Sequence, residues 1–263
     1  NGANGSLYSE FTIQGGYPAN GGDEVSSDNV TTFSGDDNYG ILNVFDRARV
    51  HINDVTFANA KGNAADAGDN ADIHTEKIGA ALWMKQKGLD GDEGDDAKAA
   101  PRVWLTHCVF DGNKTATTSG SHKYEGGSAI NIVHGAVYAD QCIFKNNYDN
   151  TRNGCVKMSG ANDYPNNPAY LFLNACSFTD NTVKNANTSA GAVIRQNRKG
   201  GLLGMYNCTL YNNVVNGTGK HAIQIDKAAI IVNTTIIDDF GGTGNYPIRY
   251  RNDTQNGHNH FIL

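Results

Sequence analysis

The sequence has no apolar run near the ~20 residues that a membrane-spanning helix requires, so we expect no transmembrane segment. It also has no cluster of Lys and Arg. Because nucleic-acid binding rests on such clusters, we do not expect a nucleic-acid partner. The formal net charge is −6, and the segment from Asp66 to Asp96 accounts for all of it with nine acidic residues against three Lys. The acidity therefore belongs to one segment, and the rest of the chain is balanced.

Familiar catalytic signatures are missing as well. The chain has no G-x-S-x-G, H-E-x-x-H or C-x-x-C motif, and its eight His are scattered. Acid–base catalysis needs two positioned groups, and nothing singles out a pair among the 27 Asp and Glu residues. We therefore predict no catalytic residue.

The N-terminus shows no charged start followed by an apolar stretch, which a signal peptide would have. The chain begins close to a predicted strand and stops abruptly at Phe261-Ile262-Leu263. We therefore expect a trimmed or mature fragment of a longer protein.

The hydrophobic fraction is low, 39%, and there are 31 Gly but only 5 Pro. Gly and the abundant Asn and Asp tolerate left-handed backbone angles in tight turns. Short apolar runs recur to the end of the chain, which a disordered tail would not show. A solenoid has a thin core because each coil contacts only its neighbours. The composition therefore favours a repetitive, turn-rich fold.

A repeat is visible in phrases that begin with Cys and end with Asn, spaced 34, 34 and 32 residues apart. They are Cys108-Val-Phe-Asp-Gly-Asn113, Cys142-Ile-Phe-Lys-Asn-Asn147, Cys176-Ser-Phe-Thr-Asp-Asn181 and Cys208-Thr-Leu-Tyr-Asn-Asn213. Weaker copies occur at 55–59 and 234–239. The first position is small, the second is mixed, and the third is large and apolar. This alternation is typical of a strand with one buried face.

A second strand precedes each phrase, with apolar residues five and three positions before the Cys, as at Val103 and Leu105. These positions lie at odd offsets from the Cys, whereas the Cys and the aromatic residue are two apart. One continuous strand cannot bury both sets, because side chains alternate with a period of two. We therefore predict a bend between them, near Thr106-His107 and Asp140-Gln141.

A third strand begins with a small residue, as in Ala81-Leu-Trp-Met84, Ala129-Ile-Asn-Ile132 and Ala192-Val-Ile-Arg195. Three short strands per coil predict an all-β fold, a single-stranded right-handed parallel β-helix (solenoid) of about seven coils, with successive coils ~4.8 Å apart. In this fold Phe110, Phe144 and Phe178 stack on one another. We expect one domain over 1–263.

Connections of variable length separate the aromatic-bearing strand from the small-residue strand, and they explain the unequal period. They run over 114–127, 148–154, 182–191 and 214–220. Acidic loop insertions are predicted at about 61–79 and 88–100. Such loops usually carry the binding function of a repeat scaffold.

The stacked Cys-x-Phe-x-x-Asn and Gly-x-Ala-Ile phrases resemble the parallel β-helix repeats of secreted and outer-surface bacterial proteins of the pectin-lyase-like superfamily. The phrases Phe11-Thr-Ile-Gln-Gly-Gly-Tyr17, Thr32-Phe-Ser-Gly-Asp36 and Val50-His-Ile-Asn-Asp-Val-Thr-Phe57 resemble the opening coils of bacterial surface members. The resemblance covers almost the whole chain and implies the fold. It does not select an activity, because the superfamily includes lyases, hydrolases, adhesins and proteins without known activity.

The Asn column (Asn113, Asn147, Asn181 and Asn213) is interpreted as a ladder. Each Asn would hold a left-handed angle and bond to the neighbouring coil. N-glycosylation at Asn113-Lys-Thr115 is the weaker reading.

The Cys column (Cys108, Cys142, Cys176 and Cys208) faces inward with parallel side-chain vectors that suit disulfides poorly. We therefore expect buried free thiols there.

Two candidate binding sites follow. The acidic loop with Asp90, Asp92 and Asp95 could bind Ca²⁺, which takes oxygen ligands in flexible loops, although a solvated charge run is the other reading.

The outward positions of the third strand are predicted to line one flat, exposed face with Trp83, Asn131, Lys157, Gln224 and Arg249, interrupted by Ile194. An exposed Trp beside amides and cations suits a sugar polymer. An ordinary solvated sheet face is the alternative reading.

We therefore expect an extracellular or bacterial outer-surface module that binds a glycan or host polymer without catalysis. The alternative is a polysaccharide lyase or glycoside hydrolase, for which Lys157, Arg195 and Arg249 are the nearby candidate bases. A structural stalk is the second alternative. Apart from Ca²⁺, no cofactor is expected.

Overall fold

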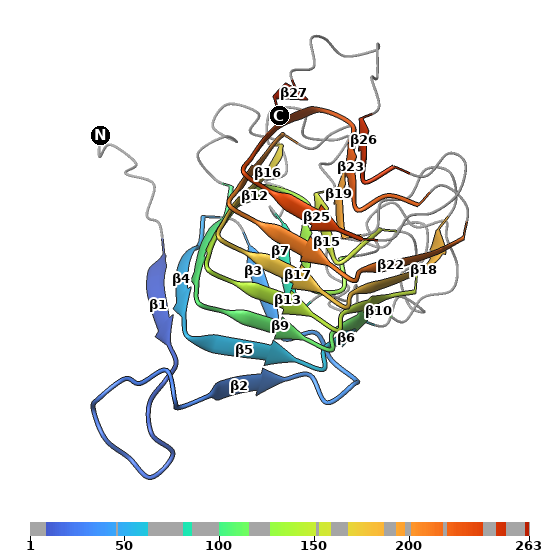
Figure 1. The fold of residues 1–263 in the computed structure, drawn as a ribbon. Coiled ribbons are helices and arrows are strands. Elements are labelled where there is room, and N and C mark those ends of the chain that lie inside the picture. Colours follow the sequence, from blue (N-terminus) through green and yellow to red (C-terminus); the bar gives the residue numbers. More distant parts are fainter. Residues whose placement is uncertain are drawn as a thin grey trace, which may run out of the picture.

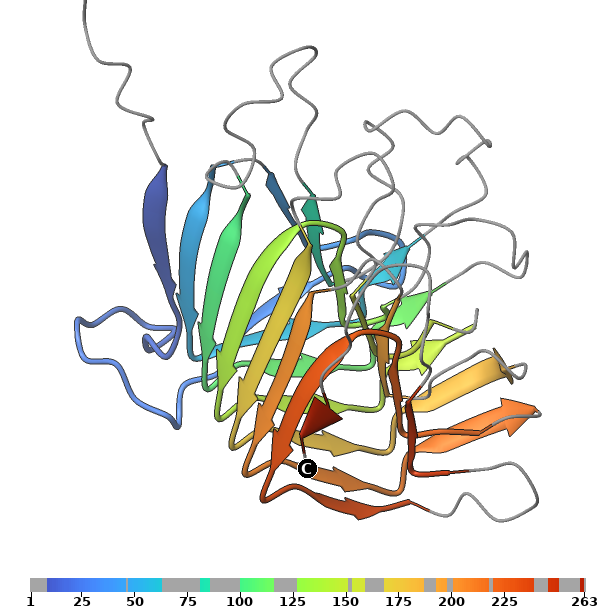
Figure 2. The same cartoon turned by 90° about the horizontal axis from the view of Figure 1, so that it is seen from above.

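The computed structural model describes residues 9–45, 47–62, 81–85, 100–115, 127–150, 153–158, 168–186, 193–197, 201–217, 220–238, 246–250 and 261–262. The predicted acidic insertions lie almost wholly outside these ranges. The described strands pair only in parallel, strand on equivalent strand of the next coil, and form a right-handed parallel β-helix. Figure 1 shows the strands stacked from the blue N-terminal end to the red C-terminal end, and Figure 2 shows the same stack from above. The predicted fold class is confirmed.

Four sheets run along the described part of the solenoid. Sheet A contains β1 (Glu10–Gln14), β4 (Arg49–Asn53), β8 (Arg102–Thr106), β12 (Gly135–Asp140), β16 (Ala169–Asn174), β20 (Leu202–Tyr206), β24 (Ala228–Val232) and β27 (Phe261–Ile262). Sheet B contains β2 (Thr31–Ser34), β5 (Val55–Ala58), β9 (Val109–Asp111), β13 (Ile143–Lys145), β17 (Ser177–Thr179), β21 (Thr209–Tyr211) and β25 (Thr235–Ile237).

Sheet C contains β3 (Leu42–Phe45), β7 (Leu82–Lys85), β11 (Ile130–Ile132), β15 (Val156–Met158), β19 (Ile194–Gln196), β23 (Ile223–Ile225) and β26 (Ile248–Tyr250). Sheet D contains β6 (Lys61–Gly62), β10 (Lys114–Thr115), β14 (Tyr148–Asp149), β18 (Thr182–Ala186) and β22 (Val214–Gly217). Sheets A, B and C are formed by the three strands that the sequence predicts in each coil. Sheet D is a fourth, short strand at the start of each variable connection, which the sequence pattern does not predict.

The core is a set of vertical columns, one residue from each coil. The rings of Phe57, Phe110, Phe144 and Phe178 stack with centroids 4.9, 4.9 and 4.4 Å apart and planes within 11° of parallel. The predicted Phe stack is therefore confirmed. At the N-terminal end Phe33 meets Phe57 edge-on, at 6.0 Å and 78°. This perpendicular ring ends the parallel stack.

The predicted bend between sheets A and B is a single residue with left-handed backbone angles. His107 has φ 51° and Gln141 has φ 52°, at the two places where the sequence requires a bend. The same corner is formed in other coils by Asp54, Ala175, Asn207 and Asn233. One left-handed residue inverts the alternation of side chains, so both strands place their apolar sets inside.

The Asn ladder forms as predicted in its hydrogen bonds. Asn147 Nδ2 donates to the carbonyl oxygen of Phe110 (2.9 Å) and to Asn181 Oδ1 (2.9 Å), and Asn147 Oδ1 accepts from the backbone N–H (3.1 Å) and Nδ2 (2.9 Å) of Asn113. The expectation that these Asn hold a left-handed angle is wrong. The preceding residue does so, as at Asn146 (φ 55°), because the ladder Asn must turn its side chain inward.

The five Cys are free and buried, as predicted for the Cys column. Each thiol in the column donates to a backbone carbonyl, as Cys142 Sγ does to Asp140 (3.3 Å). Burial raises the pKa of the Cys155 thiol, which lies in another column. These thiols act as small core residues. In the described ranges no helix is long and apolar enough to cross a membrane.

Candidate functional site

The predicted face on sheet C is a real column, with one change of register. Trp83, Asn131 and Lys157 are direct partners on β7, β11 and β15, and Gln224 pairs with Arg249. The residue between Lys157 and Gln224 is Arg195, not Ile194. Ile194 faces the core and is fully buried. The column is therefore continuous in polar character, and Lys157 and Arg195 lie side by side.

The exposure expected of this face is not found at Trp83, Asn131, Lys157 and Gln224, whereas Arg249 is partly exposed. Trp83 is 4% exposed, Lys157 2%, and Asn131 and Gln224 0%. Trp83 packs edge-on against Phe45, with ring centroids 5.4 Å apart, and Gln224 Nε2 donates to Asp226 Oδ1 at 3.0 Å. Arg195 Nη1 donates to Asn153 Oδ1 at 2.5 Å. Most of the predicted face is thus buried rather than flat and open, and a ligand on it remains a prediction.

The predicted Ca²⁺ ligands Asp90, Asp92 and Asp95 lie outside the described residues. Within the described ranges no group of three His, Cys, Asp or Glu is arranged to hold a metal ion. The Ca²⁺ site therefore stays a prediction of the sequence alone.

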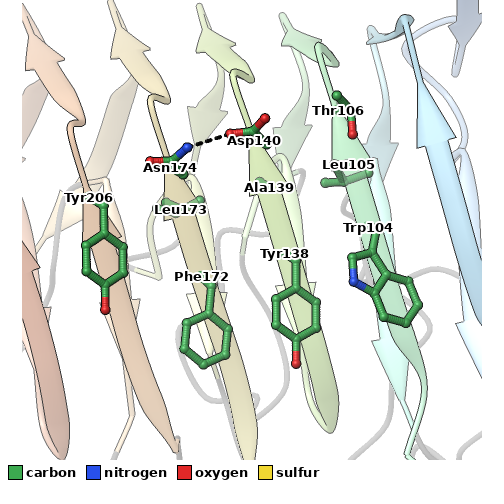
Figure 3. A pocket seen from close by; sticks show the side chains of 10 residues that line it. All are labelled: Trp104, Leu105, Thr106, Tyr138, Ala139, Asp140, Phe172, Leu173, Asn174 and Tyr206. Carbon is green, nitrogen blue, oxygen red and sulfur yellow. Dashed lines mark hydrogen bonds between the residues drawn. The ribbon is translucent and has the colours of Figure 1, made fainter.

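Sequence reasoning missed a second column, on the outer face of sheet A. His51, Trp104, Tyr138 and Phe172 are aligned by strand pairing on β4, β8, β12 and β16. Their ring centroids are 4.5, 5.6 and 5.2 Å apart, and their planes lie within 11° of parallel. Each ring is half-exposed. We call these four residues the aromatic row. The last three rings are shown in Figure 3.

The sequence carries a signal for this row. In three consecutive repeats a large aromatic residue stands between two buried apolar residues, as Trp104 stands between Val103 and Leu105. Since neighbours in a strand face opposite sides, a residue between two core positions must point out. Reading the outward as well as the inward positions of this strand would have found the row.

The aromatic row ends at Gly204, which takes the next position on β20. A Cβ at Gly204 would stand 2.8 Å from Phe172 Cδ1 and 3.2 Å from Tyr206 Cε2. The rings of Phe172 and Tyr206 therefore close over the bare backbone of Gly204, an aromatic cover of a strand glycine. The residue after Gly204 in this column is Ile230.

A polar column runs beside the aromatic row, two residues further along each strand. It contains Thr106, Asp140 and Asn174, followed by Tyr206. Asn174 Nδ2 donates to Asp140 Oδ1 at 2.7 Å, the bond drawn in Figure 3, and Gln141 Nε2 donates to Asp140 Oδ2 at 3.2 Å. These bonds fix the carboxylate beside the rings.

The rings and the polar column together line a hollow of about 220 Å³ on the outer surface of sheet A. Its walls are the rings of Trp104, Tyr138, Phe172 and Tyr206, and its polar groups are Thr106, Asp140 and Asn174. An apolar hollow with a few fixed polar groups is the usual form of a binding site for a small organic group. Of the residues that line it, Asp140 alone has a carboxyl group.

Comparison of the sequence with protein-family models finds no matching family, comparison with curated proteins finds no similar protein, and comparison with solved structures finds no match.

Proposed function

We propose that the chain is a glycan-binding β-helix module of a bacterial outer surface, related to the pectin-lyase-like superfamily, and that it binds sugar on the aromatic row without catalysis. The observation that carries the proposal is the row of partly exposed rings that line a hollow together with fixed polar groups. The face of a pyranose ring carries C–H groups and its rim carries hydroxyls. The aromatic row can contact the C–H groups of the sugar face, and the polar column can form hydrogen bonds with the hydroxyls of the rim.

The polar groups beside the rings support binding rather than bond cleavage. Glycoside hydrolysis needs a pair of carboxyl groups on the two sides of the scissile bond. Among the described residues that line the hollow only Asp140 has a carboxyl group, and its two oxygens already accept bonds from Asn174 and Gln141. An acceptor held in this way is ready to receive a hydroxyl proton donor.

A surface aromatic residue outside the site lies on the outer face of sheet B. Tyr211, in β21, is 51% exposed, lies away from the hollow and has no ring partner within the described residues. Tyr211 therefore provides a matched control for a surface aromatic residue that lies outside the site.

The test is a glycan array followed by calorimetric titration of each bound glycan with wild type, Trp104→Ala and Tyr211→Ala. We expect Trp104→Ala to weaken binding at least about tenfold, as removal of a central aromatic contact usually does, and Tyr211→Ala to leave it unchanged. Thermal unfolding of each variant shows whether it is folded, and Trp104→Leu, which keeps apolar volume but removes the ring, covers the case in which Trp104→Ala does not fold. The proposal is overturned if the wild type binds no glycan, or if Trp104→Leu binds as tightly as wild type.

A further inference from the structure

We infer that the ligand of the aromatic row is a linear, uncharged polysaccharide that lies along the solenoid axis, with one sugar residue over each coil. This inference rests on the proposed function and adds the class, direction and length of the ligand. Three observations carry it: the period of the rings, the place where the row ends, and the charge of the polar column.

The aromatic row is periodic in the direction that crosses the strands. It offers one ring per coil, with separations of 4.5, 5.6 and 5.2 Å and the same ring orientation throughout. A ligand that repeats at about the strand spacing of ~4.8 Å can place an equivalent face over every ring. An extended β-linked pyranose chain advances by about this spacing per residue. A lone sugar would use one ring and gain nothing from the others.

The length of the row sets the number of sugar positions. It contains the four rings from His51 to Phe172, and it stops at Gly204, where no side chain stands. At the other end the column continues to Thr12, which has no ring. Four sugar residues therefore cover the row. A fifth, over Gly204, has no ring in register with the row and meets the ring of Tyr206 from the polar column instead.

The charge beside the row favours an uncharged chain. The residues that line the hollow include a carboxylate, Asp140, and no Lys or Arg. A uronate would bring its own carboxylate toward Asp140, and repulsion between like charges is strong at a partly dehydrated site. The cations of this face, Arg49 and Arg102, lie on the opposite side of the row at its His51–Trp104 end, beside Glu10. Beside Tyr138 and Phe172 the same column holds Ala136 and Tyr170.

The hydrogen bonds of the polar column fit hydroxyl donors. Asp140 accepts from Asn174 and Gln141, and Asn174 Oδ1 accepts from Asn207 Nδ2 at 3.4 Å. This leaves an edge made of oxygen acceptors that are already oriented. Sugar hydroxyls can donate to this edge without moving it, and a fixed geometry lowers the entropy cost of binding.

The test is calorimetric titration of the full chain with β-1,4-linked oligosaccharides of glucose, xylose and mannose, one to six residues long, and with oligogalacturonates of the same lengths, at low and high salt. We expect affinity for at least one neutral series to rise several-fold with each residue up to four and then to level off. We expect oligogalacturonates to bind at least tenfold more weakly, and salt to leave the neutral affinities unchanged.

Phe172→Ala removes the last ring and is the decisive variant. It should move the plateau from four residues to three while Tyr211→Ala keeps it at four. A monosaccharide that binds as tightly as the tetramer would overturn the linear-polymer inference and leave the proposed function standing. Tighter binding of oligogalacturonates would overturn the uncharged class. Failure of every sugar to bind would overturn the proposed function itself.

Discussion

Among the described corner residues between sheets A and B, Ala175 alone has neither a polar side chain nor the freedom of glycine. Its φ is 50°, like the 54° of Asn207 and the 47° of Asn233 at the same corner. The left-handed region costs an ordinary residue ~1–2 kcal/mol, and Asn, Asp and Gly tolerate it better. The corner is imposed by the coils above and below, so Ala175 accepts a backbone angle that it does not favour.

Ala175→Gly should therefore stabilise the protein by about 1 kcal/mol, because relief of the left-handed angle outweighs the greater entropy of glycine in the unfolded chain. The free energy of unfolding in urea measures the effect. Ala139→Gly is the control: Ala139 lies in β12 and is buried, so this change should destabilise by about 1 kcal/mol. Equal losses in both variants would contradict the reading of Ala175.

Asp238 ends the Asn ladder and predicts a pH dependence. It accepts from the backbone N–H of Asn213 at 2.7 Å and from Asn213 Nδ2 at 3.2 Å. Burial raises the pKa of this carboxyl, an effect that the two bonds from Asn213 partly offset. A raised pKa means that the folded state prefers the protonated form, so stability from this residue is present at low pH and is lost as the pH rises through the folded-state pKa.

Asp238→Asn should consequently raise the melting temperature by a few degrees at pH 7, since the amide keeps an acceptor for Asn213 without a buried charge. The gain should vanish as the pH falls below the ordinary carboxyl pKa of 3.8, where Asp238 is itself neutral. Melting curves of both proteins across this range provide the measurement. A gain of the same size at all pH values would show that charge is not its cause.

At the scale of single elements, the turn between β13 and β14 shows how one side chain joins three coils. Asn147 bonds to the coil before it through Phe110 and Asn113 and to the coil after it through Asn181. Its neighbours would be left with buried donors and acceptors if it were removed, and each such group costs ~1–3 kcal/mol.

Asn147→Ala is expected to lower the free energy of unfolding by about 3 kcal/mol, measured by urea denaturation. Lys145→Ala, at the end of β13, removes only a partly exposed ion pair with Asp111 (3.3 Å) and should cost less than ~0.5 kcal/mol. If the two changes had equal effects, the ladder would not be a main source of stability.

Strand β19 illustrates where pattern reading fails within an element. The sequence places the small first position of this strand at Ala192, whereas the structure uses Val193, whose N–H donates to Ala222 (2.9 Å) and whose carbonyl accepts from Val156 (2.9 Å). Val193 and Ile194 are both apolar, so either could take the buried second position of the strand. Only pairing with the neighbouring coils distinguishes them, and a shift of one residue exchanges the inner and outer faces.

At the scale of the whole molecule, each coil contacts only its neighbours, so the fold should tolerate the loss of a complete coil. Deletion of residues 142–175 joins Gln141 to Cys176 and lets Gln141, already a left-handed corner at φ 52°, replace Ala175. Phe110 would then meet Phe178, and Asn113 would meet Asn181. We expect a folded, monodisperse and shorter solenoid by circular dichroism and gel filtration.

The matched control deletes one residue fewer, 142–174, and so shifts every later strand by one position. Its inner and outer faces would be exchanged from the junction onward, and we expect it not to fold. If both deletions fold equally well, the column register does not determine the structure.

The sequence by itself determined the repeat, the inward columns, the corner and the fold class. These features depend on contacts between equivalent residues of successive coils. The apolar pattern of one repeat therefore predicts which residues face the core in the others. The Phe stack, the Asn ladder and the buried thiols follow from the same columns.

Tertiary structure alone decided which faces are open. Trp83 and Lys157 occupy outward positions of sheet C and are nevertheless buried, while Trp104 and Tyr138 occupy outward positions of sheet A and are half-exposed. Alternation along a strand says that a side chain leaves the core, but it does not say what else covers the sheet. Exposure depends on segments distant in the sequence, and for that reason the aromatic row emerges as the candidate site only when the coils are stacked.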